Sequence, residues 1–178
     1  GIGALLATDE VLSQCGPFLT GGQMIRSVST EGSSYRDGSA MLETGTPRIA
    51  EAIGWGAAVD WLSKIDFKEM HDHIKHLAIT ASNGMKEIDG IRVFSDPVRP
   101  ESSGTISFLH ERITSEDMAM LLDEGGFAIR TGQHCAQPLM DALGVLSTNR
   151  ISLWIYNTEE EVKSFLSHLR MICERFGQ

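Results

Sequence analysis

The residue types best suited to chemistry lie together in residues 130–138, which read R-T-G-Q-H-C-A-Q-P. Within this loop, Cys135 follows His134 directly and lies shortly after Arg130. A thiol attacks only as its thiolate, and nearby positive charge favours that form, so these neighbours favour a nucleophilic cysteine. Gly132 lets the backbone turn sharply ahead of the cysteine. A buried structural cysteine at the end of a strand is the alternative interpretation of the same residues.

Two predicted strands and a short helix must position this loop. Residues 127–130 are expected to form a strand that runs directly into it. Pro138 suits the first turn of a short helix that reaches Leu143, and the N-terminal dipole of that helix would face the loop. A second strand is expected over 150–156, in which Arg150 faces away from the apolar side.

The rest of the second half of the chain alternates between strands and helices. The further elements expected there are strands over 91–94 and 105–109, a helix from Thr114 to Gly125, and a last helix opened by a capping box of Thr158 and Glu161. We therefore expect residues 90–178 to form a compact α+β domain, in which helices cover a small sheet and which carries Cys135.

Residues 1–89 have a different pattern. Residues 1–7 predict a buried strand, and residues 20–45 predict a long polar loop rich in Gly, Ser and Thr that is mobile or domain-swapped. Thr46 as N-cap and Pro47 as first helical residue predict a helix to about Lys64. Asp66 caps a second helix whose apolar residues recur at helical spacing. These long helices would link the two parts of the molecule.

A group of histidines at 71, 73 and 76, with Asp72 among them, raises the question of a metal site. The spacing puts His73 and His76 on one helix face, but His71 points elsewhere and no second group of ligands appears in the sequence. A solvated helix face explains these residues better, and we predict no metal site.

Composition excludes several classes of function. The 178 residues hold 15 Lys and Arg against 24 Asp and Glu, and the net charge of −9 argues against nucleic acid or an anionic membrane as a partner. No apolar run has the length of a membrane span, and we expect no signal peptide. Cys15, Cys135 and Cys173 are widely spaced, which fits a reducing cytoplasm and no disulfide framework. Cys173 lies on the apolar stripe of the last helix and is expected in the core, whereas Cys15 is expected to be structural or exposed.

Five segments, in order along the chain, resemble motifs of one enzyme family. Residues 130–138 resemble the R-T-G-x-H-C-A-x-P segment of the group II, or Suf-type, cysteine desulfurases and selenocysteine lyases of the class V aminotransferase superfamily. The other similar segments are G-I-G-A-L at 1–5, G-G-Q-M-I at 21–25, E-T-G-T-P at 43–47, and R-I-S-L at 150–153 followed by Y-N-T at 156–158. Gln133 departs from the family, because Suf-type enzymes usually carry a second histidine there, and Thr44 replaces a commonly smaller residue.

The resemblance implies a fold, a cofactor and site residues. It implies the C-terminal part of a fold type I pyridoxal-phosphate transferase, with residues 1–89 as the tail end of the large cofactor domain and 90–178 as the small domain. The matching residues imply that Cys135 is the catalytic nucleophile, that Arg150 binds the substrate carboxylate, and that Arg130 lies near substrate. Thr46 would contact the cofactor phosphate of the other subunit of a homodimer. His134, beside the nucleophile, is a further candidate site residue.

The activity implied is the conversion of L-cysteine to L-alanine, with a persulfide formed on Cys135 and passed to an acceptor protein of iron–sulfur cluster assembly. In the family the lysine that holds pyridoxal phosphate lies in an H-K-x-x-G-P segment just before G-I-G, so we expect it upstream of Gly1. We therefore expect this chain alone to be inactive and to bind no pyridoxal phosphate. The alternatives are a stand-alone module that accepts or relays sulfur without cofactor, and another class V enzyme such as a selenocysteine lyase or a kynureninase-like relative.

Overall fold

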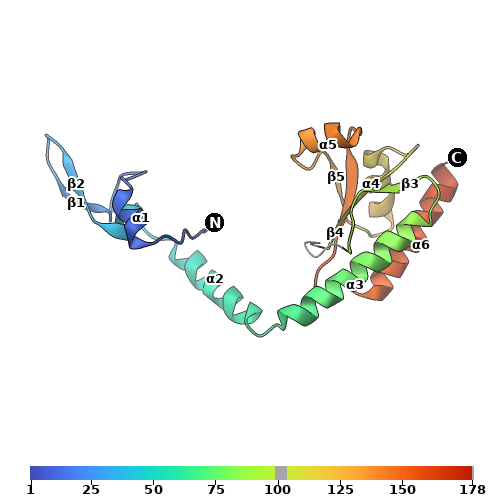
Figure 1. The fold of residues 1–178 in the computed structure, drawn as a ribbon, viewed down its shortest axis with the longest axis horizontal. Helices are drawn as coiled ribbons and strands as arrows, with labels where there is room; N and C mark the ends of the chain where they lie inside the picture. Colours follow the sequence, from blue (N-terminus) through green and yellow to red (C-terminus); the bar gives the residue numbers. More distant parts are fainter. Residues whose placement is uncertain (99–103, 178) are drawn as a thin grey trace. The chain divides into compact units, whose positions relative to one another are not determined.

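The chain divides into two compact units, Gly1–Ile65 and Asp66–Gln178. The computed structural model describes residues 1–98 and 104–177 (Figure 1). Helix α3 (Phe67–Lys86) belongs to the second unit. The reason is the apolar stripe of α3, which forms part of the second unit's core.

A four-stranded antiparallel sheet is the framework of the second unit. Its strands run in the spatial order β3-β4-β6-β5. Their bounds are Ile91–Val93 for β3, Thr105–His110 for β4, Thr148–Ser152 for β6 and Arg130–Gly132 for β5. Residues along β4 alternate between buried and half-buried, as in a strand with one face on a core. Ile106 of β4 is paired with Ile151 of β6, and Phe108 with Asn149, so these residues lie on the core face.

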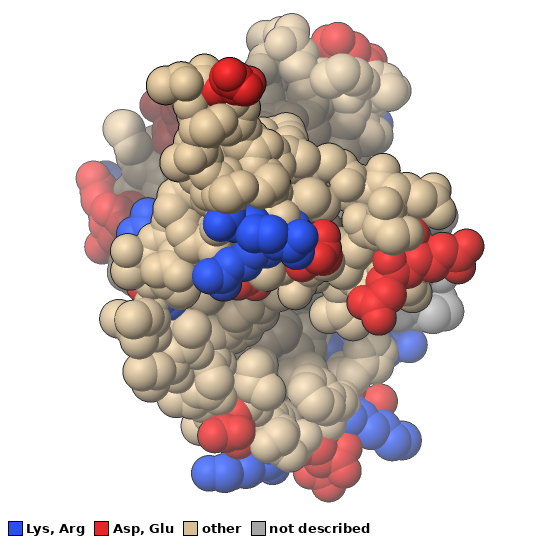
Figure 2. Space-filling model, turned by 90° about the vertical axis from the view of Figure 1, so that its left-hand side faces the viewer, with Lys and Arg blue, Asp and Glu red and all other residues tan. Residues whose placement is uncertain are grey.

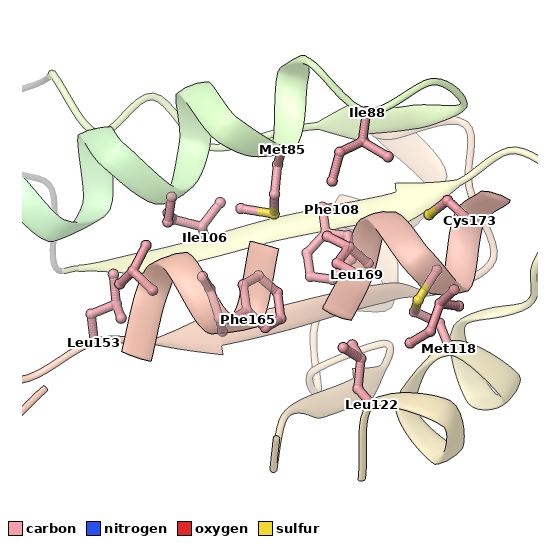
Figure 3. Packing of buried hydrophobic residues seen from close by; sticks show 14 of the residues in the cluster. Met85, Ile88, Ile106, Phe108, Met118, Leu122, Leu153, Phe165, Leu169 and Cys173 are labelled. Atoms are coloured by element: carbon pink, nitrogen blue, oxygen red, sulfur yellow. The ribbon is translucent and has the colours of Figure 1, made fainter. Parts of the chain in front are cut away.

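Three helices pack their apolar stripes against that face of the sheet: α3, α4 (Ser115–Glu124) and α6 (Glu159–Phe176). Figure 3 shows side chains of α3, β4 and α6 meeting in this core. Gly84 lets α3 approach α6 closely, because a Cβ at that position would overlap Leu166. The core is formed by residues that include Leu77, Met85, Ile106, Phe108, Met118, Leu122, Phe165, Leu169 and Cys173.

The helix caps of this unit confirm the sequence prediction. The Asp66 carboxylate accepts hydrogen bonds from the N–H groups of Lys68 and Glu69, at 2.8 and 3.1 Å. The Thr114 hydroxyl accepts from the N–H of Asp117, and Thr158 forms the predicted capping box with Glu161. Such caps satisfy N–H groups that the first turn of a helix leaves free.

Both strands beside the cysteine loop lie at shifted positions. The strand predicted over 127–130 is β5, Arg130–Gly132, because strand pairing begins only where Arg130 faces Arg150. The strand predicted over 150–156 is β6, Thr148–Ser152. It ends there because the N–H of Trp154 donates to the Asn157 side chain at 2.8 Å, in a turn that leads into α6.

The first unit contains a hairpin and three helical segments. These are α1 (Asp9–Gln14), β1 (Ile25–Val28), β2 (Ser33–Tyr35), the 3-10 helix η1 (Gly38–Met41) and α2 (Ile49–Leu62). β1 and β2 are antiparallel. Met24 is fully buried, whereas Ile53 on α2 is 70% exposed. In contrast to the second unit, most apolar side chains of this unit are exposed.

Three expectations for the first unit are corrected. Residues 1–7 form no strand and are exposed, since no other described segment pairs with them. Residues 20–45 are not one irregular loop: they contain the hairpin and η1, closed by a hydrogen bond from Arg36 N–H to the carbonyl of Met24 at 2.8 Å. Thr46 is not the N-cap of α2, because the N–H of Ile49 donates to the carbonyl of Pro47 in a tight turn and the helix begins after Arg48.

Charge and apolarity of the described residues give no sign of a membrane span. No helix among them is both long and apolar enough to cross a bilayer. Figure 2 shows one face of the molecule, on which uncharged residues predominate and charged side chains form separate groups.

Candidate functional site

The face of the sheet opposite the core carries both candidate arginines. Arg130 of β5 is paired with Arg150 of β6, and Arg150 is paired in turn with Ser107 of β4. Because directly opposed residues of antiparallel strands project to the same side, these three residues form a row across three strands. Arg130 is exposed and Arg150 and Ser107 are half-buried, so the row is open to a small polar ligand.

Arg150 has the features of an anion-binding residue. Its Nε is buried and has no hydrogen-bond partner among the described residues. A buried N–H group without a partner costs free energy, and a carboxylate would supply the missing acceptor. The planar guanidinium can bind a carboxylate through two parallel hydrogen bonds, which fixes orientation as well as affinity. The arrangement can therefore hold the carboxylate of an amino acid.

Cys135 lies in a tight turn that begins just after β5. The N–H of Ala136 donates to the carbonyl of Gln133 at 2.9 Å, which closes the turn. The two central residues, His134 and Cys135, have φ of 54° and 56°. The Cys135 side chain is exposed. This turn presents a thiol at the surface, as a nucleophile that must reach a substrate requires.

His134 connects this turn to strand β6. Its Nε2 lies 3.1 Å from the carbonyl oxygen of Thr148 and 3.0 Å from the Thr148 hydroxyl. Thr148 is fully buried and is paired with Gly132 at the end of β5. Because Arg150 follows two residues later on the same strand, one strand supports both the cysteine turn and the candidate carboxylate site.

Helix α5 (Gln137–Leu143) follows the turn and carries Pro138 in its first turn, as the sequence predicted. The N-cap, Ala136, has no side-chain cap. At the other end, Gly144 adopts φ of 68° and closes the helix in the left-handed conformation that favours glycine. The helix therefore turns the chain back toward β6.

A cavity of about 640 Å³ reaches the cysteine loop from the side of the β4–α4 connection. Gly132, Gln133 and Leu146 belong to its lining, whereas Cys135 and Arg150 do not. The candidate site is thus the open face of the sheet together with the turn, and not this cavity.

Thr46 lies in the first unit, just before α2, and is exposed. The N-cap Arg48 makes no side-chain hydrogen bond to the helix. The N–H of Ile49 already donates to the Pro47 carbonyl, so the N–H groups of the first turn left for an anion are those of Ala50 and Glu51. This donor set fits a phosphate group.

The other candidate groups lie apart from this chemistry. Cys15 is exposed. Cys173 is buried in α6, as predicted, and burial raises the pKa of its thiol to about 11. The ring Nε2 of His73 lies 2.9 Å from the carbonyl oxygen of Asn157, and that of His76 lies 3.5 Å from a Glu159 carboxylate oxygen. Over residues 1–98 and 104–177, no three His, Cys, Asp or Glu side chains are grouped to hold a metal ion.

Sequence reasoning missed Thr148 and Ser107. Thr148 was placed outside the strand, although its spacing of two from Arg150 is the signal that would have put both on one face. Ser107 was assigned to a strand, but only the pairing of β4 with β6 shows that it lies beside Arg150.

The chain is similar to known proteins over most of its length. The family model described as aminotransferase class-V matches residues 1–165. The chain is 40% identical to a cysteine desulfurase of Haloferax volcanii over 177 residues, which is 99% of this chain and 41% of the relative. It is also 40% identical to a probable cysteine desulfurase of Xylella fastidiosa, of which it covers 42%. The chain thus spans about two fifths of the length of these curated relatives.

Solved structures show the same fold. The cysteine desulfurase CsdA from Escherichia coli, in an S-sulfonic acid form, matches 95% of this chain and is covered to 41%, with a TM-score of 0.87 and 34% identity. An apo cysteine desulfurase from Thermococcus onnurineus matches 93% of the chain with the same TM-score and 29% identity. These matches confirm the expected mixed α/β fold, which is that of part of a pyridoxal-phosphate-dependent transferase. From the family model that spans most of its length, the chain belongs to the class-V aminotransferase family.

Proposed function

We propose that this chain is the C-terminal portion of a group II, Suf-type cysteine desulfurase, which converts L-cysteine to L-alanine. The relatives that match over the whole chain are named cysteine desulfurases, and the chain covers about two fifths of their length. On this proposal residues 1–89 are the tail end of the large cofactor domain and 90–178 are the small domain that carries the nucleophile.

The proposal rests on one observation. Strand β6 supports both the turn that presents the Cys135 thiol and Arg150, the candidate carboxylate-binding residue. Cys135 is exposed in its turn. The turn is bonded through His134 to Thr148, and Arg150, with its unpartnered Nε, lies two residues further on the same strand. A substrate that carries a carboxylate and a sulfur atom would engage both.

In the proposed reaction Arg150 holds the substrate carboxylate and Arg130 lies beside it. The Cys135 thiolate attacks the sulfur of the substrate, and a sulfur–sulfur bond forms as the carbon–sulfur bond of the substrate breaks. The electron pair of the broken bond stays with the substrate carbon, which takes up a proton and becomes the methyl group of alanine. The sulfur remains on Cys135 as a persulfide.

The reaction needs pyridoxal phosphate, which supplies an electron sink for the bound amino acid. In this chain the Thr46 hydroxyl and the N–H groups of Ala50 and Glu51 in the first turn of α2 would bind its phosphate, and the proposal gives this contact to the other subunit of a homodimer. A lysine that bonds to the cofactor must lose its proton readily. Contacts with Asp72 and Glu159 instead raise the pKa of Lys68 and of Lys163. The cofactor lysine is proposed to lie upstream, in the family's H-K-x-x-G-P segment.

The persulfide would pass to an acceptor protein of iron–sulfur cluster assembly, in the cytoplasm. An exposed Cys135 supports such a transfer, because the acceptor thiol must approach the outer sulfur atom. No partner of nucleic acid or membrane is proposed.

Replacing the nucleophile tests the proposal. In the intact enzyme, Cys135→Ser should abolish sulfur transfer from L-cysteine while leaving cofactor binding unchanged, since a hydroxyl does not ionise at neutral pH. Persulfide labelling and alanine release measure the two products, and cofactor absorbance measures binding. The matched control is Cys15→Ser, which removes the other exposed thiol. Transfer at the wild-type rate by the Cys135→Ser enzyme would contradict the assigned role.

A further inference from the structure

The turn that presents Cys135 is strained. Two consecutive residues with a Cβ, His134 and Cys135, occupy the left-handed region of backbone conformation. Turns with positive φ at both central residues are normally built from Asn and Gly, because other side chains clash with the backbone there. Such a conformation persists only where surrounding contacts impose it.

One hydrogen bond within the turn is not enough to explain this conformation. The bond from Ala136 N–H to the Gln133 carbonyl closes the turn at 2.9 Å. However, Ala136 and Gln133 lie at or near the surface, where water competes for the same groups. A contact between the turn and a rigid part of the fold must supply the rest of the stabilisation that the strained conformation needs.

The His134 ring makes that contact. Its Nε2 lies within hydrogen-bond distance of both oxygens of Thr148. Thr148 has no exposed surface and is paired with Gly132 in β5, and the next residue, Asn149, is paired with Phe108 of β4. The ring thus connects the strained turn to the interior of the sheet.

This contact does not depend on which ring nitrogen carries the proton. With a proton on Nε2, the ring donates to the Thr148 carbonyl; without one, Nε2 accepts from the Thr148 hydroxyl. The doubly protonated ring also donates through Nε2. Two oxygens at 3.0 and 3.1 Å therefore let the ring stay attached in every protonation state.

We propose that His134 is a positioning residue, whose ring, bonded to Thr148, holds the strained turn and so fixes the position of the Cys135 thiol. The contact between the His134 ring and Thr148, called the anchor below, is independent of the enzyme's activity. Its consequence for sulfur transfer rests on the proposed function, because only a substrate held by Arg150 requires the thiol in one fixed place.

Three substitutions at position 134 separate the anchor from local backbone preference. His134→Phe keeps a ring of similar size but removes Nε2. His134→Gln is long enough to place an amide group near Thr148 and should restore the bond. His134→Asn suits positive φ but is too short to reach Thr148. Gln133→Ala is the matched control. Gln133 contributes its main-chain carbonyl to the turn, and alanine keeps that group.

Amide hydrogen exchange of Ala136, followed by NMR on the 178-residue chain, measures how often the turn opens. In His134→Phe and His134→Asn the exchange should become about tenfold faster, the size expected when a hydrogen bond is lost. It should stay near the wild-type rate in His134→Gln and Gln133→Ala. Unchanged exchange at Ile106 and Phe108 shows that the core is still folded. Wild-type protection of Ala136 in His134→Phe or His134→Asn would overturn the proposal.

The intact enzyme gives a second, distinguishable readout. His134→Phe should lower kcat for alanine release about tenfold and change KM for L-cysteine less than about twofold, because Arg150 still holds the carboxylate. Faster exchange with an unchanged kcat would overturn the positioning role. Failure of the proposed function would show differently, as an intact wild-type enzyme that releases no alanine from L-cysteine.

Discussion

The two units of the chain treat their apolar residues in opposite ways. In the second unit the apolar stripes of α3 and α6 are buried against one face of a four-stranded sheet. In the first unit the apolar residues of α2 are not confined to one face of the helix, and its Ile49, Ile53 and Val59 side chains are 61%, 70% and 51% exposed. A helix of this kind is normally covered on several sides. The second unit therefore has a core of its own, whereas the first exposes apolar side chains of the kind that normally pack against other protein.

This difference also separates the site residues. Cys135, Arg130 and Arg150 are supported by the core of the second unit. Thr46 lies in the first unit, where few apolar residues are buried. We expect the thiol and carboxylate-binding residues to keep their geometry in this chain, and the phosphate contact to require additional protein.

The strongest test of the comparison is a matched pair of truncations. Phe108→Ala, in the core, should lower the free energy of unfolding of the second unit by about 3–5 kcal/mol. Ile53→Ala, on exposed α2, should change the free energy of unfolding by less than about 0.5 kcal/mol.

Tryptophan fluorescence can report each unit separately. Trp154 is the tryptophan of the second unit, and Trp55 and Trp61 belong to the first. Urea unfolding in a Trp55→Phe, Trp61→Phe background therefore follows the second unit alone, and unfolding in a Trp154→Phe background follows the first unit, which contains Ile53. A loss above about 2 kcal/mol for Ile53→Ala would show that α2 is packed in solution, and the contrast between the units would be wrong.

The features that the sequence predicted correctly include the helix caps and core stripes of the second unit. The caps at Asp66, Thr114 and Thr158 were predicted because each depends on a side chain and an N–H group two or three residues away. The core stripes of α3 and α6 were predicted because the apolar residues recur with the period of the helix.

What the sequence could not predict depends on distant partners or on unusual backbone. The start of β5 is set by pairing with Arg150, which is remote in sequence. The left-handed turn at His134 and Cys135 has only a weak signal in its residue types, because histidine is enriched at positive φ among residues with a Cβ but cysteine is not. The start of α2 was misplaced because Thr46 and Pro47 form a plausible first turn, which the bond between Ile49 and Pro47 delays.

Within the second unit the two faces of the sheet should also differ. Arg150→Ala removes a side chain from the open face, so it should leave the fold intact while weakening binding of the cysteine carboxylate. In the intact enzyme the loss should be about 2–4 kcal/mol, seen as a higher KM. Lysine at position 150 should recover little, because a point charge lacks the guanidinium fork. A normal KM with a destabilised fold would instead assign Arg150 to the core.

The smallest expected effect is a dependence of the second unit's stability on pH. His110, at the end of β4, is 6% exposed, and its Nδ1 accepts hydrogen bonds from the N–H groups of Arg112 and Ile113, both at 3.1 Å. Burial lowers the pKa of His110 below its usual 6.5, and Arg112 lowers it further, although Glu111 and Asp89 act in the opposite direction. Protonation of Nδ1 would also break both hydrogen bonds.

As the pH falls below about 6.5, the unfolded chain takes up this proton before the folded chain does. The second unit should then lose stability, by at most about 1.4 kcal/mol per pH unit for one proton. His110→Asn should flatten this dependence, because its amide oxygen can accept the same two N–H groups without titrating. Urea midpoints of Trp154 fluorescence between pH 7.5 and 5 would measure it. The carboxylates of Asp72 and Glu159, whose pKa values are lowered by Lys68 and Lys163, titrate at lower pH and are common to both proteins. An equal decline in the wild type and in His110→Asn would show that His110 does not couple the core to pH.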